Sequence, residues 1–239
     1  MYDKMYGYQI ELNKIAGLDV SQENLSNTFD RVSMALSAEL GEAISATKPA
    51  WVWWKRFDQQ EQEFDPAAVL EEIIDCHFFL LTMLQVLVHS NAKTDNEAEL
   101  QEKHRSMEDL LIDIQGVTAD SIQQVQDKWD NPSQSELYMY AAQSLRMATG
   151  HNGNVEFNVH DNAVSMLVYL AVAAMALGYD WRDILVYYQR KALENLDRWT
   201  VGLDDDDPKR LAALYLMDTI NFDIEAVNDL PEKELEPVT

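Results

Sequence analysis

The chain has 239 residues, of which 47% are hydrophobic and only 8 are glycine and 6 proline, so a disordered or low-complexity chain is excluded. Its 18 basic and 42 acidic residues give a formal net charge of −24, which repels nucleic-acid backbones and anionic membrane surfaces, and we expect neither as a partner. The single cysteine, Cys76, cannot form an internal disulfide, and the N-terminus lacks a signal-peptide pattern, so we expect a cytoplasmic protein.

Helical periodicity runs through the chain and no segment alternates as strands do, which predicts an all-α fold built as a multi-helix bundle. The expected core helices cover residues 2–16, 25–47, 66–89, 134–148, 159–177 and 181–200. Asp65 and Pro66 supply a good N-cap and first helical residue for the third of these. The longest apolar run, residues 78–88, is interrupted by Thr82 and Gln85 and is too short to cross a bilayer.

The helices predict a core over residues 1–202 with one insertion and a tail. The polar segment 90–135 is expected to be an inserted helical subdomain with two weaker helices, at about 96–114 and 119–129, before Asn131-Pro132 breaks the chain. Residues 203–239 are expected to form an acidic C-terminal tail with a short helix near 208–217.

Two acidic motifs carry the first functional signal: Glu39-Leu-Gly-Glu42 in the second expected helix and Glu72-Ile-Ile-Asp75 in the third. Residues at i and i+3 point the same way, so two such helices side by side bring four carboxylates together. Hard oxygen ligands of this kind select magnesium or manganese. Because apolar residues flank both motifs, we expect the charges to be buried, which is costly unless they bind a cation.

Two other interpretations fit acids at this spacing. Solvated helix faces with such spacing are commonplace in a chain with 42 acids. A di-iron carboxylate site shares the geometry but needs Glu-x-x-His, and none of the 5 histidines has an acid three residues before it. His77, alone on an apolar helix, is expected to be a satisfied core residue. An oxygen-only magnesium site is therefore the prediction.

Three further motifs add to the acids and together carry a resemblance. Trp51-Val52-Trp53-Trp54-Lys55 lies between the acidic motifs, Gln9 and Asn13 share one face of the first helix, and Lys191, Asn195 and Arg198 precede Gly202. With this set, the chain resembles the dimeric all-α dUTPases and their relatives, the phage dCTPase/dUTPases and the MazG-like NTP pyrophosphatases. The resemblance covers about residues 5–202.

The resemblance implies magnesium-dependent hydrolysis of a deoxynucleoside triphosphate, most typically dUTP, to the monophosphate and pyrophosphate, with water as the nucleophile and manganese as a possible substitute metal. It also implies a homodimer. The implied metal ligands are Glu39, Glu42, Glu72 and Asp75, with Glu39 or Glu42 as the general base. The residues implied to bind the nucleotide are Gln9 and Asn13 at the base, Trp53 or Trp54 by stacking, Lys55, Lys191 and Arg198 at the phosphates, and Asn195 at a sugar hydroxyl or phosphate oxygen.

One departure from the family pattern leaves the base open. The family helix reads Asp-x-x-His, whereas here Phe78 stands three residues after Asp75 and His77 is moved off that face. We therefore expect Phe78 to bind the substrate as an apolar wall of the pocket. Uracil, cytosine or a modified pyrimidine all stay possible, as does a MazG-like pyrophosphatase for dCTP or a non-canonical nucleotide. A catalytically silent acidic interaction protein is the alternative from another class. The apolar helix Met166–Met175 gives the homodimer only loose support.

Overall fold

The computed structural model describes residues 1–51, 64–92, 96–126, 132–152 and 159–228. Every regular element in these ranges is a helix, which confirms the all-α class. The helices are α1 (Tyr2–Ala16), α2 (Leu25–Ala46), α3 (Lys48–Trp51), α4 (Pro66–Ala92), α5 (Glu97–Gln126), α6 (Gln134–Asn152), α7 (Val159–Ala176), α8 (Trp181–Thr200) and α9 (Pro208–Asn228).

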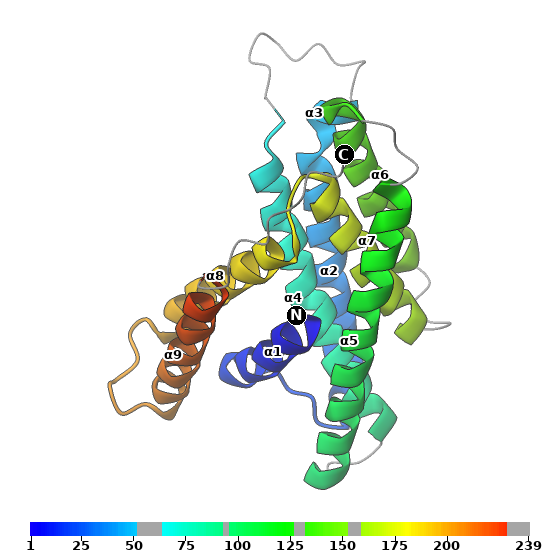
Figure 1. Ribbon diagram of the computed structural model, residues 1–239. Coiled ribbons are helices and arrows are strands. Elements are labelled where there is room, and N and C mark those ends of the chain that lie inside the picture. The colour runs from blue at the N-terminus through cyan, green and yellow to red at the C-terminus, as the bar shows by residue number, and fades with distance from the viewer. Residues whose placement is uncertain (52–63, 93–95, 127–131, 153–158, 229–239) are drawn as a thin grey trace.

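Four long helices form the central bundle (Figure 1). Helix α2 packs on α4 and α6, and α7 packs on the same two helices, so each member of the bundle has two neighbours. The apolar faces of these helices meet inside. Leu36 and Leu40 of α2 and Ile73 and Leu80 of α4 are fully buried in the shared core, as the 3.6-residue periodicity predicts.

Helix α4 is the central element, because it contacts α1, α2, α5, α7 and α8. It begins at Pro66, and the Asp65 carboxylate accepts a hydrogen bond from the Ala67 backbone N–H at 2.9 Å, as expected of an N-cap. Its most apolar 18-residue window has a mean hydropathy of 1.5, enough to cross a membrane by length and composition alone. However, 72% of that window is buried inside the molecule, which is how a core helix behaves.

Helix α7 also uses its apolar residues inside the bundle. Met166, Leu167, Leu170 and Ala173 are fully buried, and α7 packs on α6 and α4. The apolar run Met166–Met175 is thus explained by core packing. It no longer supports a homodimer, which stays an expectation from the resemblance.

Two segments differ from the sequence-based expectation in their helix bounds. Residues 97–126 form one continuous helix, α5, where two shorter helices were expected, and α5 packs on α1, α4 and α7. Helix α9 is 21 residues long where a short helix was expected. The buried side of α9 belongs to the main core and consists of Ala213, Leu216 and Ile220. Tertiary packing therefore extends α9 beyond the range that the sequence alone indicates. The division into a core, an inserted subdomain and a tail stays a prediction.

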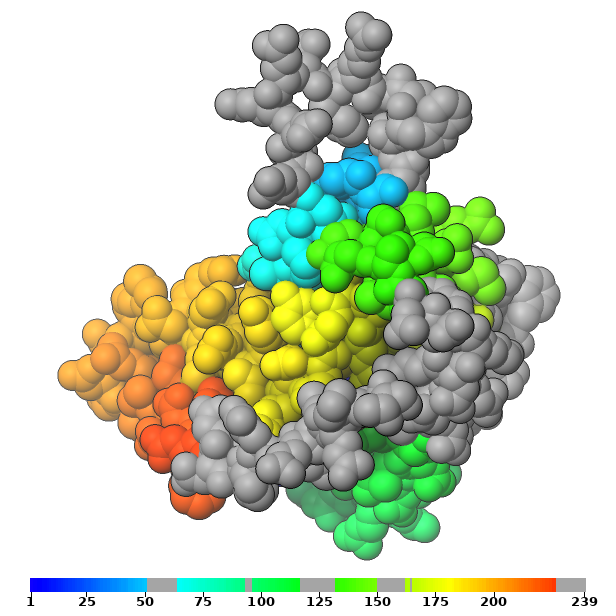
Figure 2. Space-filling model, turned by 45° about the horizontal axis from the view of Figure 1, so that its top comes forward, coloured from blue at the N-terminus to red at the C-terminus, as the bar shows by residue number. Residues whose placement is uncertain are grey.

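Helices α1, α8 and α9 lie beside the bundle (Figure 1). Helices α8 and α9, coloured from yellow to red, form one flank of the molecule (Figure 2). Helix α1 stops at Gly17, whose φ of 79° is the left-handed conformation that glycine adopts without strain. Helix α8 starts with a capping box in which Asp180 and Asp183 each bond the other's backbone N–H. These ends fix the positions from which α1 and α8 face α4.

Candidate functional site

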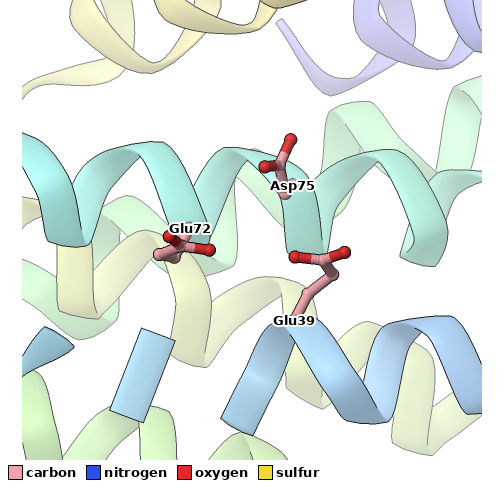
Figure 3. Close-up of side chains that lie close together, drawn as sticks. All are labelled: Glu39, Glu72 and Asp75. Carbon is pink, nitrogen blue, oxygen red and sulfur yellow. The ribbon is translucent and has the colours of Figure 1, made fainter. Parts of the chain in front are cut away.

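Three carboxylates from two helices converge beside the bundle. Glu39 projects from α2 toward Asp75 on α4, and Glu72 lies one turn earlier on α4 (Figure 3). One oxygen of each acid lies within 4.8 Å of the others. The three side chains are half-buried. An all-oxygen set of this size and spacing can hold a divalent cation such as magnesium or manganese.

Glu42, expected as a fourth member, is not part of this group of three. Its side chain is exposed on the turn of α2 after Glu39, although its charge still raises the pKa values of Glu39 and Glu72. The expectation that all four acids are buried is therefore wrong, because the motif lies at the edge of the bundle and not within its core. The assignment of Glu42 as a ligand or base stays a prediction.

The acids of the cluster hold protons more tightly than ordinary carboxyls. Burial, together with the charges of the neighbouring acids, raises the pKa values of Glu39 and Glu72. Burial also raises the pKa of Asp75, although its hydrogen bond to Lys191 opposes the shift. The site is thus a concentration of negative charge that favours a bound cation.

Lys191 of α8 is the positive group at this cluster. Its Nζ lies 2.9 Å from Asp75 Oδ2 and 3.5 Å from Glu71 Oε1. Burial alone would lower the pKa of Lys191, but the hydrogen bond and the charges of Asp75 and Glu71 outweigh it and raise the pKa. Lys191 is therefore charged beside the acids, where a phosphate oxygen can meet it.

The acidic cluster opens into a cavity of about 520 Å³ between α1, α2, α4 and α8. Most of the residues expected to bind a nucleotide are brought together here. The lining includes Gln9, Asn13, Glu39, Asp75, Phe78, Lys191, Asn195 and Arg198. Acidic and basic side chains thus line one cavity together with the amides of α1. This arrangement suits a ligand that has a polyphosphate and a polar ring. Trp53, Trp54 and Lys55 lie outside the described residues, and their assignment stays a prediction.

The amides of α1 are held by other polar side chains and not only by solvent. Gln9 Nε2 donates to Asn13 Oδ1 at 2.9 Å, and Asn13 Nδ2 donates to Thr82 Oγ1 at 3.1 Å and to Gln85 Oε1 at 2.6 Å. Tyr188 completes this set by donating to Gln9 Oε1 at 2.6 Å. Such a network fixes the two amides before a ligand arrives.

Tyr188, Thr82 and Gln85 were missed as functional candidates. The signal for two of them is present, since Thr82 and Gln85 are the polar residues that interrupt the apolar run of α4. Tyr188 carries no such signal, because a tyrosine on an amphipathic helix is usually part of the core.

Phe78 and His77 lie on different sides of α4, as the sequence predicts. Phe78 lines the cavity with Asp75 and stacks on Tyr188 with ring centroids 4.3 Å apart. His77 is fully buried; its Nδ1 lies 2.8 Å from Ile73 O and its Nε2 is 3.4 Å from the Tyr2 hydroxyl. Burial lowers the pKa of His77 to about 4, so it is a neutral core residue at physiological pH.

Cys76 follows Asp75 and is fully buried. Burial first, and then the charges of Glu39, Asp75 and Glu72, raise the pKa of its thiol well above the ordinary value. The thiol therefore stays protonated and is a poor nucleophile or metal ligand.

A comparison with protein families gives one match, a family described as dUTPase, over residues 1–202. Neither the curated proteins nor the solved structures contain a match to the chain. The matched range includes every residue that lines the cavity, whereas α9 lies beyond it. The chain therefore belongs to the dUTPase family and is a nucleotide hydrolase of that kind.

Proposed function

We propose that the chain is a magnesium-dependent dUTP diphosphatase that hydrolyses dUTP to dUMP and pyrophosphate. The observation that carries the proposal is the convergence of Glu39, Glu72 and Asp75, two of which, Glu39 and Asp75, line the same cavity as Lys191, Gln9 and Asn13. This cavity combines a site for a divalent cation, cationic donors for phosphate and amides for a base in a chain of the dUTPase family.

The donor set fits magnesium, since all three converging side chains are carboxylates and no nitrogen or sulfur ligand stands among them. A magnesium ion held by Glu39, Glu72 and Asp75, with Glu42 close by, would neutralise the triphosphate charge. Manganese, with the same preference for oxygen, is the expected substitute.

The protein side chains have separate tasks in this reaction. Glu39 or Glu42 accepts the proton of the attacking water. Lys191 donates to phosphate oxygens as a point charge, and Arg198 can bind them in a bidentate manner. Asn195, between these two on the same helix face, hydrogen-bonds a sugar hydroxyl or a phosphate oxygen. Gln9 and Asn13 hold the base.

The test is pyrophosphate release from dUTP, dCTP, dTTP and UTP, with magnesium and with EDTA. We expect turnover of dUTP that EDTA abolishes and that manganese partly restores. Turnover of dCTP or a non-canonical nucleotide in preference to dUTP would replace the substrate in the proposal. Absence of release from every nucleotide with metal present would exclude the hydrolase.

Substitutions test the metal ligands. Asp75→Asn is expected to lower kcat by roughly a hundredfold or more because it removes a charged ligand, and Glu42→Gln tests the fourth acid by the same assay. The matched control is Asp218→Asn, the same change on an exposed position of α9, which should leave kcat unchanged. An Asp75→Asn enzyme with a near-normal rate would show that Asp75 is not a ligand.

We also infer a homodimer, on the basis of the family resemblance alone. Sedimentation equilibrium of the purified chain gives the mass directly. A species of one chain across the micromolar range would contradict this inference without affecting the cavity.

A further inference from the structure

A chain of hydrogen bonds lies behind one wall of the cavity. Gln9 and Asn13 line the cavity, whereas Tyr188 and Gln85, which bond to them, do not. Tyr188 is fully buried and Gln85 is 3% exposed. The hydrogen bonds run from Tyr188 to Gln9, then to Asn13, and end on Thr82 and Gln85. A ligand in the cavity therefore meets two amides that are held by Tyr188 and Gln85, which do not line the cavity, and by Thr82, which does.

The series of hydrogen bonds has a direction, which starts at the Tyr188 hydroxyl. The Tyr188 hydroxyl has one hydrogen, and burial raises its pKa well above the ordinary value, so it stays protonated. It lies 2.6 Å from the Gln9 amide and 3.2 Å from Met5 O. In the structure the oxygen of Gln9 accepts from the Tyr188 hydroxyl, and its nitrogen donates to Asn13 Oδ1.

The direction of these hydrogen bonds determines which donor and acceptor groups Asn13 and Gln9 can still offer to a ligand. The Asn13 amino group uses its two hydrogens on Thr82 and Gln85, while Asn13 Oδ1 accepts from Gln9 Nε2 and keeps a lone pair. Gln9 Nε2 keeps one hydrogen. The cavity thus offers an acceptor at Asn13 and a donor at Gln9.

The reverse direction is chemically possible with the same groups. If the amides of Gln9, Asn13 and Gln85 all turned over, the Tyr188 hydroxyl would donate to Met5 O and accept from Gln9. The Gln85 amino group would then donate to Asn13 Oδ1, while the Thr82 hydroxyl could keep its present hydrogen bond to Phe78 O. The cavity would then offer a donor at Asn13 and an acceptor at Gln9. Uracil matches the first pattern with its N3–H and O4, and cytosine in the same position matches the second with its N3 lone pair and amino group.

We propose that Tyr188 is a positioning residue that determines base specificity, because its hydroxyl holds the Gln9–Asn13 pair in the direction that selects uracil over cytosine. The inference rests on the proposed function for the identity of the ligand class. Phe78 keeps the Tyr188 ring in place by stacking on it with an interplanar angle of 20°. Phe78, which departs from the family pattern, thereby acts on base selection through Tyr188.

The test is Tyr188→Phe, which removes the hydroxyl and keeps the ring that stacks on Phe78. Binding of the α,β-imido analogues of dUTP and dCTP is measured by calorimetry with magnesium present. We expect the ratio of the two Kd values to move toward cytosine by roughly tenfold, because one amide is no longer held. With the hydrolysable nucleotides, KM for dUTP should rise while kcat changes little.

The matched control is Tyr2→Phe. Tyr2 is equally buried and donates its hydroxyl to Leu167 O at 3.0 Å, but it has no bond to Gln9 or Asn13. A structural effect of losing a buried hydroxyl would weaken both analogues alike in either variant. Gln85→Met removes the hydrogen bond at the Asn13 end of the series and should shift the ratio of the two Kd values in the same direction. This variant provides the test if Tyr188→Phe does not fold.

The outcomes separate this inference from the proposed function. Turnover of dUTP with the same base preference in wild type, Tyr188→Phe and Gln85→Met would overturn the inference and leave the hydrolase intact. A wild-type preference for the cytosine analogue would overturn it as well, since it contradicts the direction of the chain. Selective binding of the dUTP analogue, lost in Tyr188→Phe, by a protein without turnover would support the inference and exclude the hydrolase.

Discussion

At the scale of single residues, the acids of the cluster make the metal-free protein sensitive to pH. Burial and the charges of Glu42 and Asp75 raise the pKa of Glu72. At pH values just above the ordinary pKa of a glutamate, the Glu72 carboxyl therefore binds more proton in the folded state than in the unfolded state. The free energy of unfolding falls as pH rises through that interval and stays reduced at neutral pH. The folded site is strained by its own charge until a cation binds.

Glu72→Gln should therefore stabilise the metal-free protein. In EDTA at neutral pH we expect a higher Tm than for wild type, and at acid pH, where Glu72 is protonated, the difference should vanish. Magnesium should raise the Tm of wild type more than that of the variant. Glu225→Gln, at an exposed position of α9, serves as the control. If Glu72→Gln in EDTA is no more stable than this control, repulsion within the cluster is not destabilising.

At the scale of elements, α9 braces the helices that carry the cavity. It packs on α8 and α1, and its Asp223 accepts hydrogen bonds from Lys4 and Tyr8 of α1. Gln9 and Asn13, which line the cavity, also lie on α1. Helix α9 lies beyond the residues that match the family, and its contacts stabilise the helices of the matched range.

Two substitutions on α9 separate its buried and exposed sides. Ile220 is fully buried, and Ile220→Ala should lower the free energy of unfolding by about 2–5 kcal/mol through lost contacts and a cavity. Phe222 is 71% exposed, and Phe222→Ala should change it by less than about 0.5 kcal/mol. Urea denaturation of both variants measures the difference. Equal losses would show that α9 does not pack as described.

At the scale of the whole molecule, His104 links α5 to α1 and contributes to acid sensitivity. Its Nδ1 lies 2.8 Å from the Tyr6 hydroxyl, and its ring meets that of His89 on α4. Burial, and then the charges of His89 and Lys14, lower its pKa from 6.5 to about 4. The charge of Glu108 also acts on Tyr6 and raises the pKa of its hydroxyl, after burial. The contact joins three helices through one neutral imidazole.

The stability that depends on this neutral ring should be lost in acid. Between about pH 6.5 and 4 the unfolded state binds a proton that the folded state does not, so the free energy of unfolding falls as pH falls through this window. His104→Asn keeps a polar partner for Tyr6 and removes this loss. We expect wild type to lose roughly 1 kcal/mol more than the variant between neutral pH and pH 5, after a discount for solvent screening. Parallel urea titrations at the two pH values check this, and equal losses would contradict the prediction.

Much of the fold was predictable because its signals are local. Helix periodicity, the Asp65-Pro66 start of α4 and the i,i+3 spacing of Glu72 and Asp75 depend on neighbours within a turn or two. Longer-range effects account for the differences. Helix α5 is continuous because α1, α4 and α7 pack along it, and propensity alone does not report such support.

The sequence by itself determined the all-α class, the acidic motifs and the residue types that gather in the cavity, because each follows from composition or from spacing along one helix. Only the tertiary structure decided how the helices rotate against one another. That rotation brings Glu39, Glu72 and Asp75 together, leaves Glu42 exposed and puts the Tyr188 hydroxyl against Gln9. These contacts join residues far apart in the chain, so packing and not local pattern sets them.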